Sequence, residues 1–201
     1  MIKAHPNRYS LWFYSSWFRV LQKLFFRQIR VIALGEFPAG KSVLLLQNHF
    51  SYYDGYWSMF LCHTLFRRRF HVMMLEEQMQ KRMFLARCGV FSVRKNSRDL
   101  IESLHYAKTL LQNPANVVTI YPSGGIISQH RQNFSFEGGF ARLAGGDHVH
   151  IAFAVVLTDY FSAARPEISI YVDNYKGEKT AKAIENAYHT FYQSCIKKQN
   201  E

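Results

Sequence analysis

Residues 43–55 read Val-Leu-Leu-Leu-Gln-Asn-His-Phe-Ser-Tyr-Tyr-Asp-Gly. The four apolar residues at the start of this stretch predict a buried strand. Ser51 and Asp54 then predict a helix start, with a capping side chain and early negative charge. Within one continuous helix, the five-residue spacing would turn His49 and Asp54 about 140° apart. With His49 on a loop and Asp54 in the first helical turn, the two can converge as a general base and the carboxylate that fixes its tautomer.

Strands and helices alternate along the rest of the chain, without repeats or linkers. Predicted strands cover residues 43–46, 70–75, 90–93, 117–121, 150–157 and 167–172. Predicted helices cover residues 55–65, 76–88, 99–112, 138–144 and 180–198. This alternation predicts a single α/β domain with a mostly parallel or mixed central sheet flanked by helices. We expect this domain at residues 35–201, preceded by an amphipathic helical segment at residues 1–34.

The periodicity of residues 10–30 predicts that N-terminal helix. Its broad apolar face is largely aromatic: Phe13, Tyr14, Trp17, Phe18, Val20, Leu21, Leu24 and Phe25. Four basic residues are spaced by four, four and three positions, which predicts a basic stripe on another side of the helix: Arg19, Lys23, Arg27 and Arg30. Aromatic rings on one side and cations on another favour a helix lying on an anionic membrane surface. The alternative is an ordinary amphipathic helix packed on its own domain.

The chain has 201 residues and a formal net charge of +11. Such a charge predicts an anionic partner, which could be nucleic acid, lipid headgroups or a phosphorylated substrate. No recognised nucleic-acid-binding module is visible, so we expect no nucleic acid partner. Neither an apolar run of membrane-spanning length nor a cleavable signal is evident, which favours a peripheral protein. Three widely spaced cysteines without a CxxC pair favour a reducing compartment, and hence the cytoplasmic face of the cell membrane.

Two further loops follow predicted strands, where open α/β sheets collect their sites. Arg94 and Lys95 follow the strand at residues 90–93, and they could bind a phosphate or form a basic surface turn. The stretch Ser123-Gly124-Gly125 follows the strand at residues 117–121. Its glycines permit a tight turn whose N–H groups could stabilise an oxyanion, although such a stretch is more often only a turn.

Two other kinds of site are not predicted. Ser123 lacks the Gly-x-Ser-x-Gly elbow of a triad nucleophile. The two histidines of Asp147-His148-Val149-His150 have no third ligand at a suitable spacing, so we predict no metal site.

The order of these blocks resembles the PlsC-like glycerolipid (lysophospholipid) acyltransferases. The resemblance runs from about residue 43 to residue 157 and rests on Asn48-His49-x4-Asp54, Gly89-x-Phe91-x-x-Arg94, Tyr121-Pro122-Ser123-Gly124 and Phe136-Glu137-Gly138-Gly139-Phe140-Ala141. It implies acyl transfer from acyl-CoA or acyl carrier protein to a hydroxyl or amine of a lipid-like acceptor. The transfer would take place at a membrane surface, without a metal or other cofactor.

The resemblance also implies roles for individual residues. His49 would deprotonate the acceptor, and Asp54 would orient and electrostatically support His49. Arg94 would hold an acceptor phosphate, and the backbone around Ser123 to Gly125 would line the acceptor or oxyanion site. The expected substrate-binding residues are therefore Asn48, Ser51, Arg94, Lys95, Ser123, Gly124 and Gly125.

The chain departs from the family pattern in its third and fourth blocks. The third block of the family usually reads Phe-Pro-Glu-Gly-Thr-Arg, whereas residues 121–126 here read Tyr-Pro-Ser-Gly-Gly-Ile. The fourth, a strand at residues 151–155, lacks the usual proline. The missing glutamate and arginine favour a non-standard acceptor, such as a glycolipid, an amino-acid lipid or a polyene pigment, over a glycerol phosphate. They also leave open a non-catalytic protein that binds a membrane surface or an anionic ligand on an acyltransferase scaffold.

Overall fold

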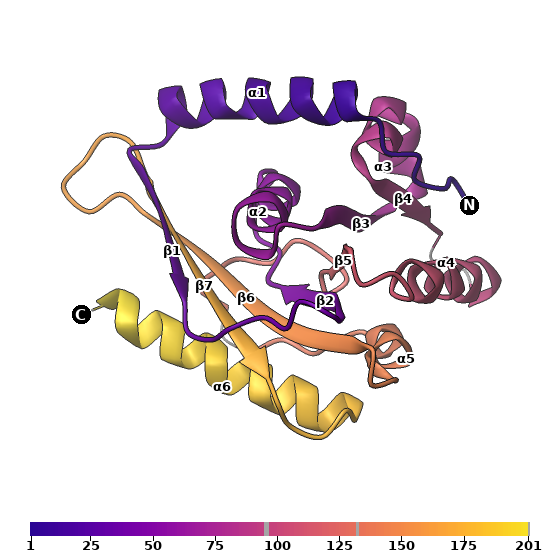
Figure 1. The fold of residues 1–201 in the computed structure, drawn as a ribbon. Coiled ribbons are helices and arrows are strands. Elements are labelled where there is room, and N and C mark those ends of the chain that lie inside the picture. Colours follow the sequence, from indigo (N-terminus) through magenta and orange to yellow (C-terminus); the bar gives the residue numbers. More distant parts are fainter. Residues whose placement is uncertain (95–96, 132, 201) are drawn as a thin grey trace.

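A mixed seven-stranded sheet forms the centre of the molecule, and helices cover both of its faces (Figure 1). The computed structural model describes residues 1–94, 97–131 and 133–200. The strands are β1 (Gln28–Ala33), β2 (Ser42–Gln47), β3 (Arg69–Leu75), β4 (Val90–Val93), β5 (Asn116–Ile120), β6 (Val149–Asp159) and β7 (Glu167–Tyr175). Their order is β1-β7-β6-β2-β5-β3-β4. Strands β6, β2, β5, β3 and β4 are parallel, whereas β7 and β1 run in the opposite direction.

Helices lie on both faces of this sheet (Figure 1). On one face are α1 (Arg8–Phe25), α2 (Asp54–Leu61) and α3 (Glu76–Gln80). On the other are α4 (Ser97–Leu110), α5 (Ala141–Ala144) and α6 (Ala181–Asn200). The predicted α/β class with a mixed central sheet is confirmed.

The side chains of β2 pack into the core on both faces of the sheet. All six of its residues are buried, as expected of a central strand in a parallel region. Val43 and Leu45 pack in the cluster beneath α1 and α2, and Leu44 and Leu46 pack in the cluster beneath α4 and α6. Since β2, β5, β3 and β4 are parallel, the loops that follow them gather at one edge of the sheet.

Two predicted helices on the α1 face are shorter than expected. The helix predicted over residues 55–65 is α2 followed by a π-helical turn, Cys62–Phe66, which ends at Arg67 with φ of 53°. The helix predicted over residues 76–88 stops at the end of α3, and a 3-10 turn, Met83–Cys88, follows it. Gly89 ends that turn with φ of 101°, a left-handed conformation that glycine adopts easily.

The helix predicted over residues 10–30 is correct only as far as Phe25. From Gln28 the chain is a strand, and β1 pairs with β7 in parallel over six residues. Isoleucine and valine at residues 29, 31 and 32 suit a strand, and the ladder with β7 outweighs the local helical periodicity. Arg27 and Arg30 therefore do not extend a helical stripe; they lie 3.1 and 3.3 Å from carboxylate oxygens of Glu167.

Helix α1 packs on the same core as α2. Phe18 is buried, its ring stacks on that of Tyr56 at 4.4 Å, and Tyr14 and Leu21 are partly buried beside it. The boundary at residue 34 between this segment and the domain stays a prediction. Within the described parts of the chain, no helix combines the length and the apolar character needed to cross a bilayer.

Candidate active site

His49 and Asp54 meet at the carboxyl end of β2. Asp54 is fully buried, and its Oδ2 accepts hydrogen bonds from Nδ1 of His49 at 2.7 Å and from the backbone N–H groups of Phe50 and Ser51 at 2.7 and 2.8 Å. The loop thus closes onto the first turn of α2, and the carboxylate is held from three directions. Because Nδ1 donates to the carboxylate, Nε2 of His49 is the ring nitrogen left to accept a proton. The structure brings together the two residues that the spacing singled out.

Tyr121 covers one face of His49. The two rings are stacked, with centroids 4.3 Å apart and planes inclined by 18°. The Tyr121 hydroxyl lies 3.0 Å from Oγ of Ser58, which comes from α2. Burial, followed by the nearby Asp54 carboxylate, raises the pKa of Tyr121, so the phenol stays protonated and uncharged. The resemblance places Tyr121 in its third block without predicting this contact, and the position of Tyr121 after a strand was the one available signal.

The loop after β5 wraps around the histidine. Ile127 donates its N–H to the carbonyl oxygen of His49 at 2.8 Å. Within the same loop Gly124 has φ of 66°, and its N–H donates to the carbonyl of Tyr121 at 3.1 Å. The Ser123 hydroxyl donates to the carbonyl of Gly125 at 2.9 Å, and Gly125 has open space beside its Cα. The predicted turn at Ser123 to Gly125 therefore borders the His49 loop.

Asn48 and Ser51 make positioning contacts. The side-chain amide of Asn48 is buried and forms two hydrogen bonds of 2.8 Å with the backbone of Val156, accepting from its N–H and donating to its carbonyl. These bonds tie the end of β2 to β6. Oγ of Ser51 accepts from the N–H of Tyr53 at 3.0 Å, a bond within the loop before α2. The predicted cap at Ser51 is wrong, because Tyr53 is the N-cap residue of α2 and, among the described residues, no side chain caps this helix.

Arg94 lies at the end of β4, the edge strand, three strand spacings or about 14 Å along the sheet from β2. Its Nε and Nη2 donate to Oε1 of Glu76 at 2.8 and 2.5 Å, and its Nη1 lies 3.4 Å from Oδ2 of Asp99. Glu76 is buried, and hydrogen bonds from Ser92 and Arg94 lower its pKa. Two carboxylates thus face the guanidinium. Lys95, the other predicted phosphate ligand, lies outside the described residues.

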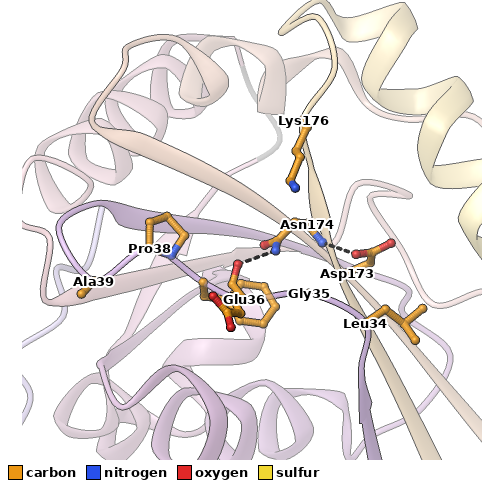
Figure 2. Close-up of a pocket in the computed structure, with 9 residues that line it drawn as sticks. Leu34, Gly35, Glu36, Pro38, Ala39, Asp173, Asn174 and Lys176 are labelled. Atoms are coloured by element: carbon orange, nitrogen blue, oxygen red, sulfur yellow. Dashed lines mark hydrogen bonds between the residues drawn. The ribbon is translucent and has the colours of Figure 1, made fainter.

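A cavity of about 840 Å³ lies away from these residues. It is lined by Leu34, Gly35, Glu36, Phe37, Pro38, Ala39, Asp173, Asn174 and Lys176 (Figure 2). The loop that forms it precedes β2, so it lies at the opposite edge of the sheet from His49. Asn174 crosses it to donate a hydrogen bond to the carbonyl of Glu36 (Figure 2). Among the residues the structure describes, no group of three or more histidine, cysteine, aspartate or glutamate side chains could hold a metal ion.

Comparisons with known proteins agree with this arrangement. A family model described as Acyltransferase matches residues 28–154, which is more than half of the chain. The crystal structure of the 1-acyl-sn-glycerophosphate (LPA) acyltransferase PlsC from Thermotoga maritima has a similar fold, with a TM-score of 0.56 at 11% identity. That similarity covers 92% of this chain and 78% of the other. A comparison with curated proteins gives no significant match. The chain belongs to the acyltransferase family and is an acyltransferase enzyme with a PlsC-like α/β fold.

Proposed function

We propose that this enzyme moves a fatty acyl group from a thioester donor, acyl-CoA or acyl carrier protein, to a hydroxyl or amine of a lipid-like acceptor. His49 acts as the general base. The observation that carries the proposal is the buried Asp54 carboxylate, which accepts from Nδ1 of His49 and leaves Nε2 as the proton acceptor. Family membership disfavours the alternative of a non-catalytic binding protein on this scaffold.

The proposed reaction needs one base and one oxyanion site. Nε2 of His49 takes the proton of the acceptor hydroxyl as its oxygen attacks the thioester carbonyl carbon. The new C–O bond forms, and the carbonyl oxygen becomes an oxyanion that hydrogen-bond donors of the site stabilise. Collapse of the oxyanion breaks the C–S bond, and the sulfur leaves with the proton held by His49. Asp54 stabilises the imidazolium between the two steps.

The cysteines support direct transfer to the acceptor. Cys62, Cys88 and Cys195 are all buried. Burial raises the pKa of each thiol, to about 11 for Cys88 and about 12 for Cys195. Protonated, buried thiols are poor nucleophiles, so an acyl-cysteine intermediate is disfavoured.

The charges around the site favour an acceptor without a phosphate. The turn at Ser123 lacks the arginine of the family pattern. Arg94 keeps its cation, yet a phosphate would compete with Glu76 and Asp99 for the guanidinium. We therefore propose a hydroxyl or amine acceptor whose headgroup is not anionic.

The outer side of α1 is the proposed membrane contact. Its exposed residues are mostly apolar, and Trp12, for example, is 68% exposed. The exposed apolar side chains of the helix are Tyr9, Trp12, Phe13, Trp17, Val20, Leu24 and Phe25. The polar exposed residues Arg8, Arg19 and Lys23 add cations to the same helix. Exposed aromatic residues combined with cations are typical of helices that lie in the headgroup region of anionic membranes.

Two other segments extend this apolar face. Phe84 is exposed, and its ring lies 6.0 Å from that of Tyr14 on α1. At the far end of α1, the loop between β6 and β7 carries the exposed Tyr160 and Phe161 (Figure 1). Arg165 of that loop donates to the carbonyl of Lys23 at 2.8 Å, which fixes the loop against the helix.

The loop between β2 and α2, which holds His49, lies near the apolar face of α1. Tyr52 lies between His49 and Asp54 and is 69% exposed. The guanidinium of Arg82 lies 5.5 Å from the centre of the Tyr52 ring, and the exposed Met83 follows Arg82 in the chain. A lipid acceptor could thus reach His49 from the bilayer. The anionic lipids of the cytoplasmic leaflet suit a chain of net charge +11, so we propose the cytoplasmic face of the cell membrane.

Acyl transfer is tested by product analysis. The full chain is incubated with labelled acyl-CoA or with labelled acyl carrier protein, each with a lipid extract, and lipid products are separated and identified by mass spectrometry. We expect label in a new ester or amide with one of the donors, and none with heat-inactivated protein. Label confined to free fatty acid, with both donors and several extracts, would contradict the proposal.

Membrane binding is tested by sedimentation with vesicles of phosphatidylglycerol and phosphatidylcholine. Serine replaces Trp12, Trp17 and Leu24 together, and Ile101→Ser is the matched control because Ile101 is exposed on α4, on the other side of the sheet. We expect the triple variant to bind at least about tenfold more weakly, since each buried apolar side chain contributes about 1.5–3 kcal/mol. Equal binding by the triple variant and the control would refute the contact.

A further inference from the structure

Glu137 lies directly across the turn that follows β5. Its N–H donates to the carbonyl of Pro122 at 2.7 Å. A Cβ atom added to Gly124 would come within 2.6 Å of Cγ of Glu137 and 3.1 Å of its Oε1. Gly124 also has φ of 66°. Only glycine at this position combines that conformation with room for the glutamate side chain above it.

The carboxylate of Glu137 is available to a ligand. The residue is exposed. Within residues 1–94, 97–131 and 133–200, no cation or hydrogen-bond donor pairs with its side-chain oxygens. Its backbone is fixed by the hydrogen bond to Pro122 and its side chain lies over Gly124, so the carboxylate is exposed at this turn.

The turn beneath Glu137 belongs to the surroundings of His49. Tyr121, at the start of the turn, stacks on the His49 ring, and Ile127, at its end, donates to the His49 carbonyl. Glu137 therefore faces a loop that contacts the proposed base at both of its ends. The family pattern would place a glutamate at position 123, where this chain has serine.

We propose that Glu137 is a specificity-determining residue that binds a hydroxyl or ammonium group of the acceptor. It supplies, from a different position, the carboxylate that Ser123 does not. A carboxylate accepts hydrogen bonds from hydroxyl and ammonium donors and repels a phosphate. The acceptor class is thus a lipid with a non-anionic, hydroxyl- or amine-bearing headgroup, an assignment that rests on the proposed acyl transfer.

Acceptor binding and acyl transfer are measured separately to test this. The probes are a monoacylglycerol, a long-chain amine and lysophosphatidate, each dispersed in neutral detergent. The variants are Glu137→Gln and Glu137→Lys, with Glu102→Gln as the matched control because Glu102 is an exposed glutamate on α4. Glutamine keeps the size of the side chain and the backbone bond to Pro122, and circular dichroism verifies the fold of each variant.

We expect Glu137→Gln to weaken binding of the monoacylglycerol or the amine by about tenfold or more, because a charge-assisted hydrogen bond is lost. The KM for that acceptor rises with it. Glu137→Lys shifts preference towards lysophosphatidate. Glu102→Gln behaves as wild type.

The outcomes separate the two proposals. Unchanged binding and KM in both Glu137 variants would overturn the role of Glu137 while leaving acyl transfer intact. Weaker acceptor binding in Glu137→Gln without any transfer by the wild type would uphold the role of Glu137 and overturn the proposed reaction. Preference of the wild type for lysophosphatidate over both other probes would overturn the acceptor class.

Discussion

The ring of Tyr121 stacks on the ring of His49 at 4.3 Å, while the Tyr121 hydroxyl reaches Ser58 on α2. Tyr121, which directly follows β5, thus fixes the plane of the His49 ring, and the hydrogen bond to the Asp54 carboxylate fixes the direction in which Nδ1 points. The imidazole is held by two groups that lie far apart in the sequence. Its free nitrogen therefore has a defined direction.

The ring of Tyr121, rather than its hydroxyl, is expected to matter for activity. Tyr121→Phe keeps the stacking and loses one hydrogen bond, so we expect activity near that of wild type and a stability loss of about 1 kcal/mol. Tyr121→Leu removes the stacked ring, and we expect at least about a tenfold lower rate of transfer. Rates and melting temperatures of the two variants check this. Equal rates for phenylalanine and leucine would show that stacking is irrelevant.

Asp54→Asn is expected to lower the rate of acyl transfer by about 100- to 10,000-fold, because the amide cannot support an imidazolium as a carboxylate does. The neutral side chain is also a weaker acceptor for the N–H groups of Phe50 and Ser51, so the melting temperature falls. The control is Asp147→Asn, at an exposed position. Steady-state rates and thermal unfolding test both effects, and a rate within tenfold of wild type would speak against the role of Asp54.

Substitution of Asn48 is expected to lower the stability of the fold rather than to change substrate binding directly. Asn48→Ala leaves the N–H and carbonyl of Val156 without their side-chain partners. We expect the free energy of unfolding to fall by about 2–3 kcal/mol. Chemical denaturation measures this. A stable variant with a raised KM for the acceptor would instead support the substrate contact that the resemblance implies.

Acid is expected to destabilise the protein through His71. Burial lowers the pKa of His71 from its ordinary 6.5 to about 4. Between these values the unfolded chain binds a proton that the folded protein does not, so stability falls as the pH drops from about 6.5 towards 4. The loss from this group is at most about 3 kcal/mol. Denaturant titrations at several pH values should show that the free energy of unfolding falls less with acid in His71→Leu than in wild type or in a variant at the exposed His105. An identical pH dependence in all three proteins would contradict the assignment.

The parts of the fold that could be predicted are those fixed by neighbouring residues. The apolar run at residues 43–46 predicts a central strand because every side chain there is apolar. The His49–Asp54 pair forms within one loop and one helical turn, so the strand-to-helix pattern of residues 43–55 predicts that the two side chains meet. Ser51 makes a local bond to Tyr53 but is not the helix cap that the sequence predicts.

The parts that could not be predicted depend on distant partners. β1 is a strand because it pairs with β7, which begins more than a hundred residues later. From the sequence alone Arg94 is a cation without a known partner, whereas in the structure it pairs with Glu76 and Asp99. Likewise, nothing in the local sequence of Glu137 shows that it lies over Gly124. The contacts of Arg94 and Glu137 bear on the proposed acceptor site, whereas the pairing of β1 bears on the fold.

His49 is the proposed base of acyl transfer. Its role is tested by acceptor-dependent release of free thiol from the thioester donor, by wild type and by His49→Ala at equal concentrations of folded protein. We expect His49→Ala to keep the fold and donor binding but to lose about 100- to 10,000-fold in rate, the usual contribution of a general base. Thiol release by His49→Ala within tenfold of the wild-type rate would contradict it.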